Sequence, residues 1–175
     1  VEEMAAEEMA AEGWFQKGYN AGMNGEYNAE ISLYLKAIEL KPDYADAYIN
    51  LGIAYQKQNN YTKAIQMWEK AIELKPDDAD AYYNLGNAYK DKNNLIKAVQ
   101  MWENAIELEP DDADAYINLG IAYGKQDNYT KAIQMWEKAI KLNPDDADAY
   151  INLGIAYREQ NNYTKAIQSY EKAIE

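Results

Sequence analysis

The sequence contains no cysteine and no histidine, and it has only one phenylalanine among 175 residues. Without cysteine the chain has no disulfide, no thiolate nucleophile and no cysteine-based zinc site, and the redox compartment is left open. Without histidine it lacks the usual general base near neutral pH and the commonest metal ligand. There is also no glycine-rich phosphate loop. These absences predict a protein that is not an enzyme and uses no cofactor or metal.

Basic residues are few. The chain has 30 acidic residues against 17 basic ones, a net charge of −13. Such a charge repels phosphate backbones, so we expect no nucleic-acid partner and no attraction to anionic membrane surfaces. No apolar run approaches the ~20 residues of a membrane span, and the acidic start at residues 1–4 does not resemble a signal peptide. We therefore expect no membrane insertion.

What is abundant is tyrosine. The sequence has 17 tyrosines and four tryptophans, with 48% apolar and 27% charged residues overall. This composition predicts a soluble, globular protein rather than a disordered one. Because so many rings must be buried, we expect a regular interior lined with them.

A period of 34 residues organises most of the chain. A Leu-Gly pair and a proline both recur at this spacing: Leu51-Gly52, Leu85-Gly86, Leu119-Gly120 and Leu153-Gly154, with Pro42, Pro76, Pro110 and Pro144. Residues 45–78 and 113–146 are identical at 30 of 34 positions without a gap. Such a period predicts stacked repeats, each of which buries its apolar face against the next.

Each unit contains two helical patterns. In 45–78, the spacing of Tyr48, Leu51, Gly52 and Tyr55 places them on one face of a first helix. Ala64, Ile65, Trp68, Ala71 and Ile72 follow the same rule in a second helix. Since a glycine inside a helix costs ~1 kcal/mol relative to alanine, Gly52 needs a reason. We expect that it lets the two helices approach closely, with Trp68 filling the space beside it.

The loops carry helix-ending and helix-starting residues. Asn59-Asn60 is expected to separate the two helices, because asparagine tolerates the left-handed conformation that ends a helix. Pro76 stops the second helix, and the acidic residues 77–80 cap the next one and complement its positive end. A calcium loop is disfavoured here because the stretch lacks the turn glycine and bidentate glutamate of an EF-hand.

The order aromatic-x2-Leu-Gly-x2-Tyr, then Ala-x3-aromatic, Ala and Pro, resembles the tetratricopeptide repeat (TPR) family. Tyr48 and Trp68 stand at the family's usual Trp and Phe positions, so each keeps an aromatic ring. The resemblance implies an all-α fold, a right-handed superhelical solenoid of tandem TPR helix-turn-helix repeats. It also implies a protein-protein interaction scaffold that binds an extended peptide or protein segment in a concave groove.

We divide the chain into six segments on this basis. They are an N-terminal helical extension (1–10), a degenerate TPR unit (11–44), three full TPR units (45–78, 79–112 and 113–146) and a truncated unit (147–175). In the degenerate unit, Lys17, Ala21 and Glu30 replace the usual Leu, Tyr and Ala. The truncated unit stops at Glu175 inside its second helix. We expect a bare hairpin face there, which makes self-association a further partner mode.

The first helix of each unit has a second stripe, roughly opposite the Leu-Gly face. In proteins that resemble this one, that face lines the groove. Its candidate binding residues are Ile49, Ile53, Tyr83, Asn87, Ile117, Ile121, Ile151 and Ile155. Two interpretations stay open: these side chains contact a ligand, or they pack against the first helix of the neighbouring repeat.

One asparagine per unit falls on the same stripe: Asn50, Asn84, Asn118 and Asn152. A primary amide has two donor hydrogens and an acceptor oxygen, so it can pair with a peptide backbone without reading its sequence. The row resembles the asparagine ladder in the TPR groove of O-GlcNAc transferase. The alternative is that asparagine here serves the scaffold, as it does in family members without such a role.

The carboxylate clamp of TPR co-chaperones is absent. The early-helix positions that would need lysine or arginine carry Asp46, Asp80, Asp114 and Asp148 instead. Two alternatives to peptide binding stay open. One is a structural or self-assembling solenoid, consensus-like or engineered, with no dedicated ligand. The other is a non-catalytic arm of a larger enzyme.

Overall fold

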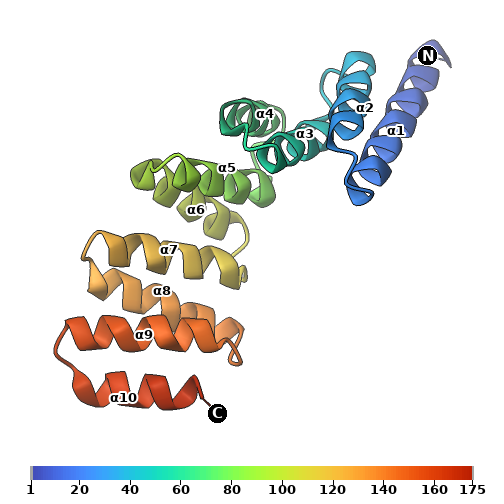
Figure 1. The fold of residues 1–175 in the computed structure, drawn as a ribbon. Coiled ribbons are helices and arrows are strands. Elements are labelled where there is room, and N and C mark those ends of the chain that lie inside the picture. Colours follow the sequence, from blue (N-terminus) through green and yellow to red (C-terminus); the bar gives the residue numbers. More distant parts are fainter. Residues whose placement is uncertain (1, 175) are drawn as a thin grey trace. The chain divides into compact units, whose positions relative to one another are not determined.

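The computed structural model describes residues 2–174, and every regular element in this range is an α-helix, ten in all (Figure 1). The chain divides into two compact units, Val1–Ala98 and Val99–Glu175. Val1 and Glu175, at the outer ends of the predicted first and last segments, lie outside the described residues.

The first unit stacks two complete helical hairpins and the helix that follows them. Its helices are α1 (Glu2–Met23), α2 (Tyr27–Leu40), α3 (Ala45–Lys57), α4 (Tyr61–Leu74), α5 (Ala79–Asp91) and the start of α6 (Leu95–Leu108). Helices that follow one another from α1 to α5 contact each other, and the first helices α1, α3 and α5 also contact in sequence. Each hairpin therefore packs on the next, as expected for tandem repeats.

The second unit repeats this arrangement. It contains the rest of α6, then α7 (Ala113–Lys125), α8 (Tyr129–Leu142), α9 (Ala147–Glu159) and α10 (Tyr163–Lys172). Helices α7 and α8, α8 and α9, and α9 and α10 pack together, and the first helices α7 and α9 also touch (Figure 1). The predicted all-α architecture of tandem helix-turn-helix repeats is confirmed.

Left-handed residues end the first helices, as the asparagine pairs predict. The second residue after the first helix has a φ near +60° in four hairpins: Asn59, Asn93, Asp127 and Asn161. The next asparagine then caps the second helix, since the side chains of Asn60, Asn128 and Asn162 accept backbone N–H groups three residues on. One short asparagine-rich loop thus terminates one helix and starts the other.

Aspartates start the following first helices. The side chains of Asp78, Asp112 and Asp146 accept backbone N–H groups from the first turns of α5, α7 and α9. The degenerate hairpin differs, since neither Glu26 before α2 nor Tyr44 before α3 makes a side-chain cap. The polar loops therefore specify the helix boundaries best where the repeat is most regular.

Three glycines of the Leu-Gly pairs, Gly52, Gly120 and Gly154, face aromatic rings, which explains why glycine is kept inside these helices. A Cβ on Gly52 would lie 2.5 Å from the indole nitrogen of Trp68, and one on Gly154 would lie 2.5 Å from the ring of Tyr170. Trp68 is fully buried, and its ring N–H donates to the carbonyl oxygen of Ile49 at 3.1 Å. Close approach of the two helices thus requires the missing Cβ, as predicted.

The degenerate hairpin buries a carboxyl group where the other units have alanine. Glu30 on α2 is 3% exposed, and its Oε1 lies 3.7 Å from Nζ of Lys57 on α3. Gly22 on α1 makes room for it, because a Cβ there would lie 2.6 Å from Cδ of Glu30. Burial raises the pKa of Glu30, and the charge of Lys57 opposes that rise. Gly22 and Lys57 therefore offset the departure at Glu30 only in part, because its Oε2 is buried without a hydrogen-bond partner in the described part of the chain.

A tyrosine-glutamate hydrogen bond recurs between successive hairpins. The hydroxyl of Tyr89 donates to Glu69 at 3.0 Å, and that of Tyr157 donates to Glu137 at 2.7 Å. Tyr123 and Glu103 make the same bond at 2.5 Å. Burial, then the bond to the carboxylate, raises the pKa of each of these tyrosines to about 12.

We expect Tyr157→Phe to lower the free energy of unfolding by about 1.5 kcal/mol at pH 7, because a hydrogen bond to a charged group is lost. Because the folded pKa of about 12 exceeds the ordinary 10, the contribution of Tyr157 is complete below pH 10. It is lost as the pH rises towards 12. The gap between wild type and variant, measured by urea unfolding, should therefore close between pH 10 and 12.

The matched control is Tyr163→Phe, since Tyr163 is 60% exposed and its hydroxyl donates to the exposed side chain of Asn161. This change should stay within about 0.5 kcal/mol of wild type. Equal losses for the two variants, or a gap for Tyr157→Phe that is independent of pH up to 12, would contradict a stabilising bond between Tyr157 and Glu137.

Candidate functional site

In the first compact unit, Val1–Ala98, the candidate residues lie on helices α3 and α5, which contact each other. Ile49 is only 9% exposed, so for this side chain the packing interpretation is the better one. Ile53 and Tyr83 are half-buried. Asn87, which stands where other units have isoleucine, is also half-buried, and its Oδ1 is a buried acceptor without a hydrogen-bond partner in the described part of the chain.

In the second unit the same face is more open. Ile151 and Ile155 on α9 are 41% and 37% exposed, whereas Ile117 and Ile121 on α7 are half-buried. Asn152 lies between the two exposed isoleucines along the helix. The same residue type at the same repeat position is thus buried at Ile49 and exposed at Ile151, and the second unit offers more apolar surface to a ligand.

Two of the four asparagines of the predicted ladder, Asn50 and Asn84, donate hydrogen bonds to their own helices. Nδ2 of Asn50 donates to the carbonyl oxygen of Asp46 at 2.8 Å, and Nδ2 of Asn84 donates to that of Asp80 at the same distance. An amide has two donor hydrogens, so each side chain keeps one N–H and its Oδ1 for another partner. The bond to the preceding turn holds the amide in one orientation, which reduces the entropy lost if a ligand pairs with it.

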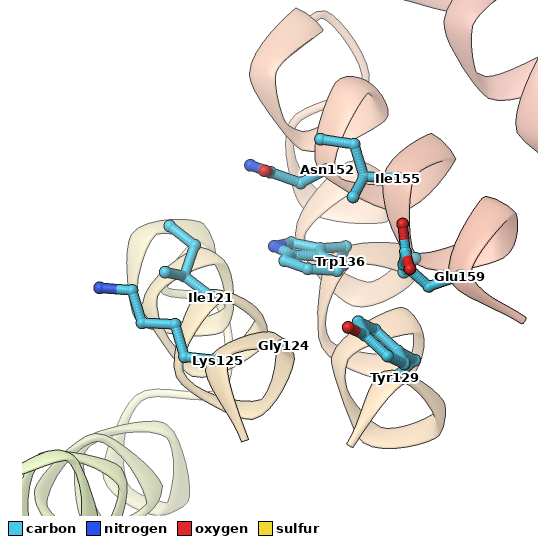
Figure 2. Close-up of a pocket in the computed structure, with 9 residues that line it drawn as sticks. Ile121, Gly124, Lys125, Tyr129, Trp136, Asn152, Ile155 and Glu159 are labelled. Atoms are coloured by element: carbon cyan, nitrogen blue, oxygen red, sulfur yellow. The ribbon is translucent and has the colours of Figure 1, made fainter. Parts of the chain in front are cut away.

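A pocket opens on this face in the second compact unit, between residues of α7 and α9, and residues of α8 form part of its wall (Figure 2). Its volume is about 260 Å³. Three predicted residues line it, together with six that were not predicted. The predicted ones are Ile121, Asn152 and Ile155, and the others are Gly124, Lys125, Tyr129, Trp136, Ala156 and Glu159. Trp136 lies between the labelled residues of the two first helices (Figure 2).

Gly124 distinguishes the unit 113–146 from the other full TPR units, which have a long side chain at this position. The equivalent residues of the second, third and last TPR units are Gln56, Lys90 and Arg158. A Cβ on Gly124 would lie 3.3 Å from Cη2 of Trp136, so a long side chain there would occupy the space over the indole ring. The candidate binding residues were predicted from positions that recur in each unit. Gly124 departs from the recurring residues, so this pattern did not identify it.

The charges at the pocket are unevenly paired. Glu159 accepts from the guanidinium of Arg158 at 2.7 Å. Lys125 is exposed and makes no ion pair with the described side chains, those of residues 5–174. Over the described residues there is no cluster of three acidic side chains that could hold a metal ion, and no helix is long and apolar enough to cross a membrane.

Family models match nearly the whole chain. Those described as TPR repeat match residues 54–93 and 86–127, and those described as tetratricopeptide repeat match residues 11–44, 33–66 and 117–175. The chain therefore belongs to the tetratricopeptide repeat family. Proteins of this family are generally scaffolds for protein interactions and are typically not enzymes. A comparison with curated proteins gives no match.

Solved structures share the fold. A crystal structure of MamA is 29% identical with a TM-score of 0.85, and the match covers 90% of this chain and 92% of that one. YrrB, described as a TPR protein with an unusual peptide-binding site, is 26% identical with a TM-score of 0.80, covering 92% and 83%. PilF of Pseudomonas aeruginosa, 21% identical with a TM-score of 0.83 and covering 97% and 77%, supports the fold alone.

Proposed function

We propose that this chain is an interaction scaffold that binds an extended peptide or protein segment along the first-helix face. We define this face as the stripe of Ile, Asn and Tyr candidates on α3 and α5 in the first unit, and of Ile and Asn candidates on α7 and α9 in the second. The observation that carries the proposal is the surface of α9, where Ile151 and Ile155 remain 41% and 37% exposed on either side of Asn152. A helix surface that faces only water is ordinarily polar.

The chemistry of the face suits a backbone in extended conformation. An extended segment presents alternating side chains and, between them, N–H and C=O groups without internal partners. The second N–H and the Oδ1 that Asn50 and Asn84 keep can satisfy such groups irrespective of sequence, and the isoleucines can cover the apolar side chains of the segment. That YrrB carries a peptide-binding site supports the proposal that this fold can hold one.

Self-association, the other partner mode expected from the sequence, stays a prediction. The surface of α10 leaves Tyr163 and Ile167 60% and 56% exposed. Nothing on the first-helix face depends on it.

We expect the double change Asn118→Ala with Asn152→Ala to weaken peptide binding by roughly 30-fold. Each lost amide costs ~1 kcal/mol where the ligand backbone can still reach water, and 1.4 kcal/mol is a factor of ten. Peptides that bind the wild-type chain are selected from a synthetic array of 12-residue peptides, and their affinities for both proteins are measured by titration calorimetry. The loss should be similar for all of them, because the amides read the backbone.

The matched control removes two amides from the second helices, Gln134→Ala with Gln168→Ala, both at exposed positions. This variant should bind as the wild type does. Unchanged affinity in the asparagine variant, with melting temperatures equal in all three proteins, would show that the asparagines serve the scaffold alone.

A further inference from the structure

The pocket over Trp136 is more specific than the rest of the first-helix face. We propose that it anchors one aromatic side chain of the bound segment, and that an acidic residue beside that side chain pairs with Lys125. This inference rests on the proposed peptide-binding function and states which residues the segment must carry.

The size and walls of the pocket suit a ring. An apolar cavity of ~150 Å³ binds benzene, so the 260 Å³ here leave room for a ring and the carbon that joins it to a backbone. Ile121, Ile155 and Ala156 provide aliphatic surface, and the rings of Tyr129 and Trp136 add aromatic walls. Aromatic pairs gain attraction beyond the area that they bury, so these walls favour a ring over an aliphatic side chain of equal size.

Only one full unit has the opening that this site requires. Gly124 exposes the edge of Trp136, whereas the corresponding residues of the second, third and last TPR units have long side chains. Nearly identical repeats would bind a segment in any register, because each would offer the same contacts. A pocket that one of the three full units carries instead fixes the register, since among these units the anchor residue can enter at one place only. The degenerate unit also has glycine at this position, Gly22, but the carboxyl group of Glu30 fills the space beside it.

The positive charge of Lys125 at the pocket indicates which residue of the bound segment lies next to its aromatic side chain. Glu159 is engaged by Arg158, which leaves the Lys125 ammonium as the unpaired charge that lines the pocket. Elsewhere in this unit lysines lie over tyrosine rings, Lys131 at 4.9 Å from that of Tyr123 and Lys165 at 5.0 Å from that of Tyr157. An ammonium group is attracted both by the face of a ring and by a carboxylate. A ligand with an aromatic residue next to aspartate or glutamate complements both properties.

The test begins with the array of 12-residue peptides on the full chain. Peptides that bind should be enriched in Phe, Tyr or Trp adjacent to Asp or Glu. In a selected peptide, replacing the aromatic residue by alanine should weaken binding tenfold or more, as expected for burial of a large apolar side chain. Replacing the adjacent acid by its amide should weaken binding roughly two- to fivefold, and only at low salt, because the pair is exposed.

The protein variant is Gly124→Gln, which fills the pocket with the side chain that Gln56 already places in the second TPR unit. It should weaken binding of the aromatic peptide at least tenfold and that of its alanine version less than twofold. The matched control is Lys90→Gln. It places the same side chain at the equivalent position of the third TPR unit (79–112), and it should change neither affinity.

The outcomes separate the two proposals. If no array peptide binds the wild-type chain, the proposed function fails and this inference fails with it. If peptides bind without aromatic enrichment, or if Gly124→Gln weakens both peptide versions equally, the anchor site is wrong while peptide binding stands. The alanine scan of the peptide decides the matter on wild-type protein even if Gly124→Gln does not fold.

Discussion

Trp68→Ala is expected to lower the free energy of unfolding by about 3–5 kcal/mol, because it removes a large buried side chain and leaves a cavity. The ring of Trp68 is fully buried, and its N–H bonds the carbonyl oxygen of Ile49 at 3.1 Å, so the change also leaves that oxygen without its partner. Denaturant unfolding followed by circular dichroism measures the loss.

Tyr170→Ala provides the matched control for this change. Tyr170 occupies the same repeat position and faces Gly154 as Trp68 faces Gly52, but it is only half-buried. Its loss should cost less than half as much. Equal costs for the two positions would contradict the assignment of Trp68 to the centre of its hairpin core.

Gly120→Leu is expected to cost about 2–3 kcal/mol through overpacking. Even a Cβ at Gly120 would lie 2.6 Å from Cε2 of Trp136, so the added side chain must push α7 and α8 apart. Repeats contact only their neighbours, and hydrogen exchange should therefore show lost amide protection in α7, α8 and α9. Amides of α1 and α2 should keep theirs.

The same substitution at an open site isolates the packing cost. No atom lies within 4 Å of a Cβ built on Gly13 of α1, so Gly13→Leu should stabilise the helix by up to about 1 kcal/mol through helix propensity. Destabilisation of similar size at both glycines, or a uniform loss of protection along the chain after Gly120→Leu, would contradict the account of helix approach.

The fold was predictable because its signals repeat. Each hairpin needs a small residue opposite a ring, a left-handed residue after the first helix and a cap before the second. Gly52, Asn59 and Asn60 supply these within one unit, and the 34-residue period repeats them. Agreement of local signals with one architecture is what specifies a structure. The ion pair of Glu30 with Lys57 was not predictable, because it joins residues of successive units outside the shared pattern.

The site was only partly predictable from sequence, for two physical reasons. Exposure depends on what lies against a side chain, and identical letters therefore give 9% exposure at Ile49 and 41% at Ile151. The pocket depends on Gly124, which differs from the residues at the same position of the second, third and last TPR units, so a pattern of recurring residues does not indicate it. Helical spacing gave the stripe on which the pocket lies. However, the sequence placed Trp68, the repeat equivalent of Trp136, only in the hairpin interior, whereas Trp136 is 4% exposed and also lines the pocket.

The most direct measurement of the central claim is a chemical-shift map of the full ¹⁵N-labelled chain, titrated with an array-selected 12-residue peptide. The account predicts that the perturbed amides include the side chains of Asn118 and Asn152 and the backbones of Ile121, Gly124 and Ile155, all on the first-helix face. Residues on the outer surfaces of α8 and α10, such as Gln134 and Gln168, should be unaffected. Perturbations confined to those second helices, with the first-helix face unchanged at saturation, would contradict the account.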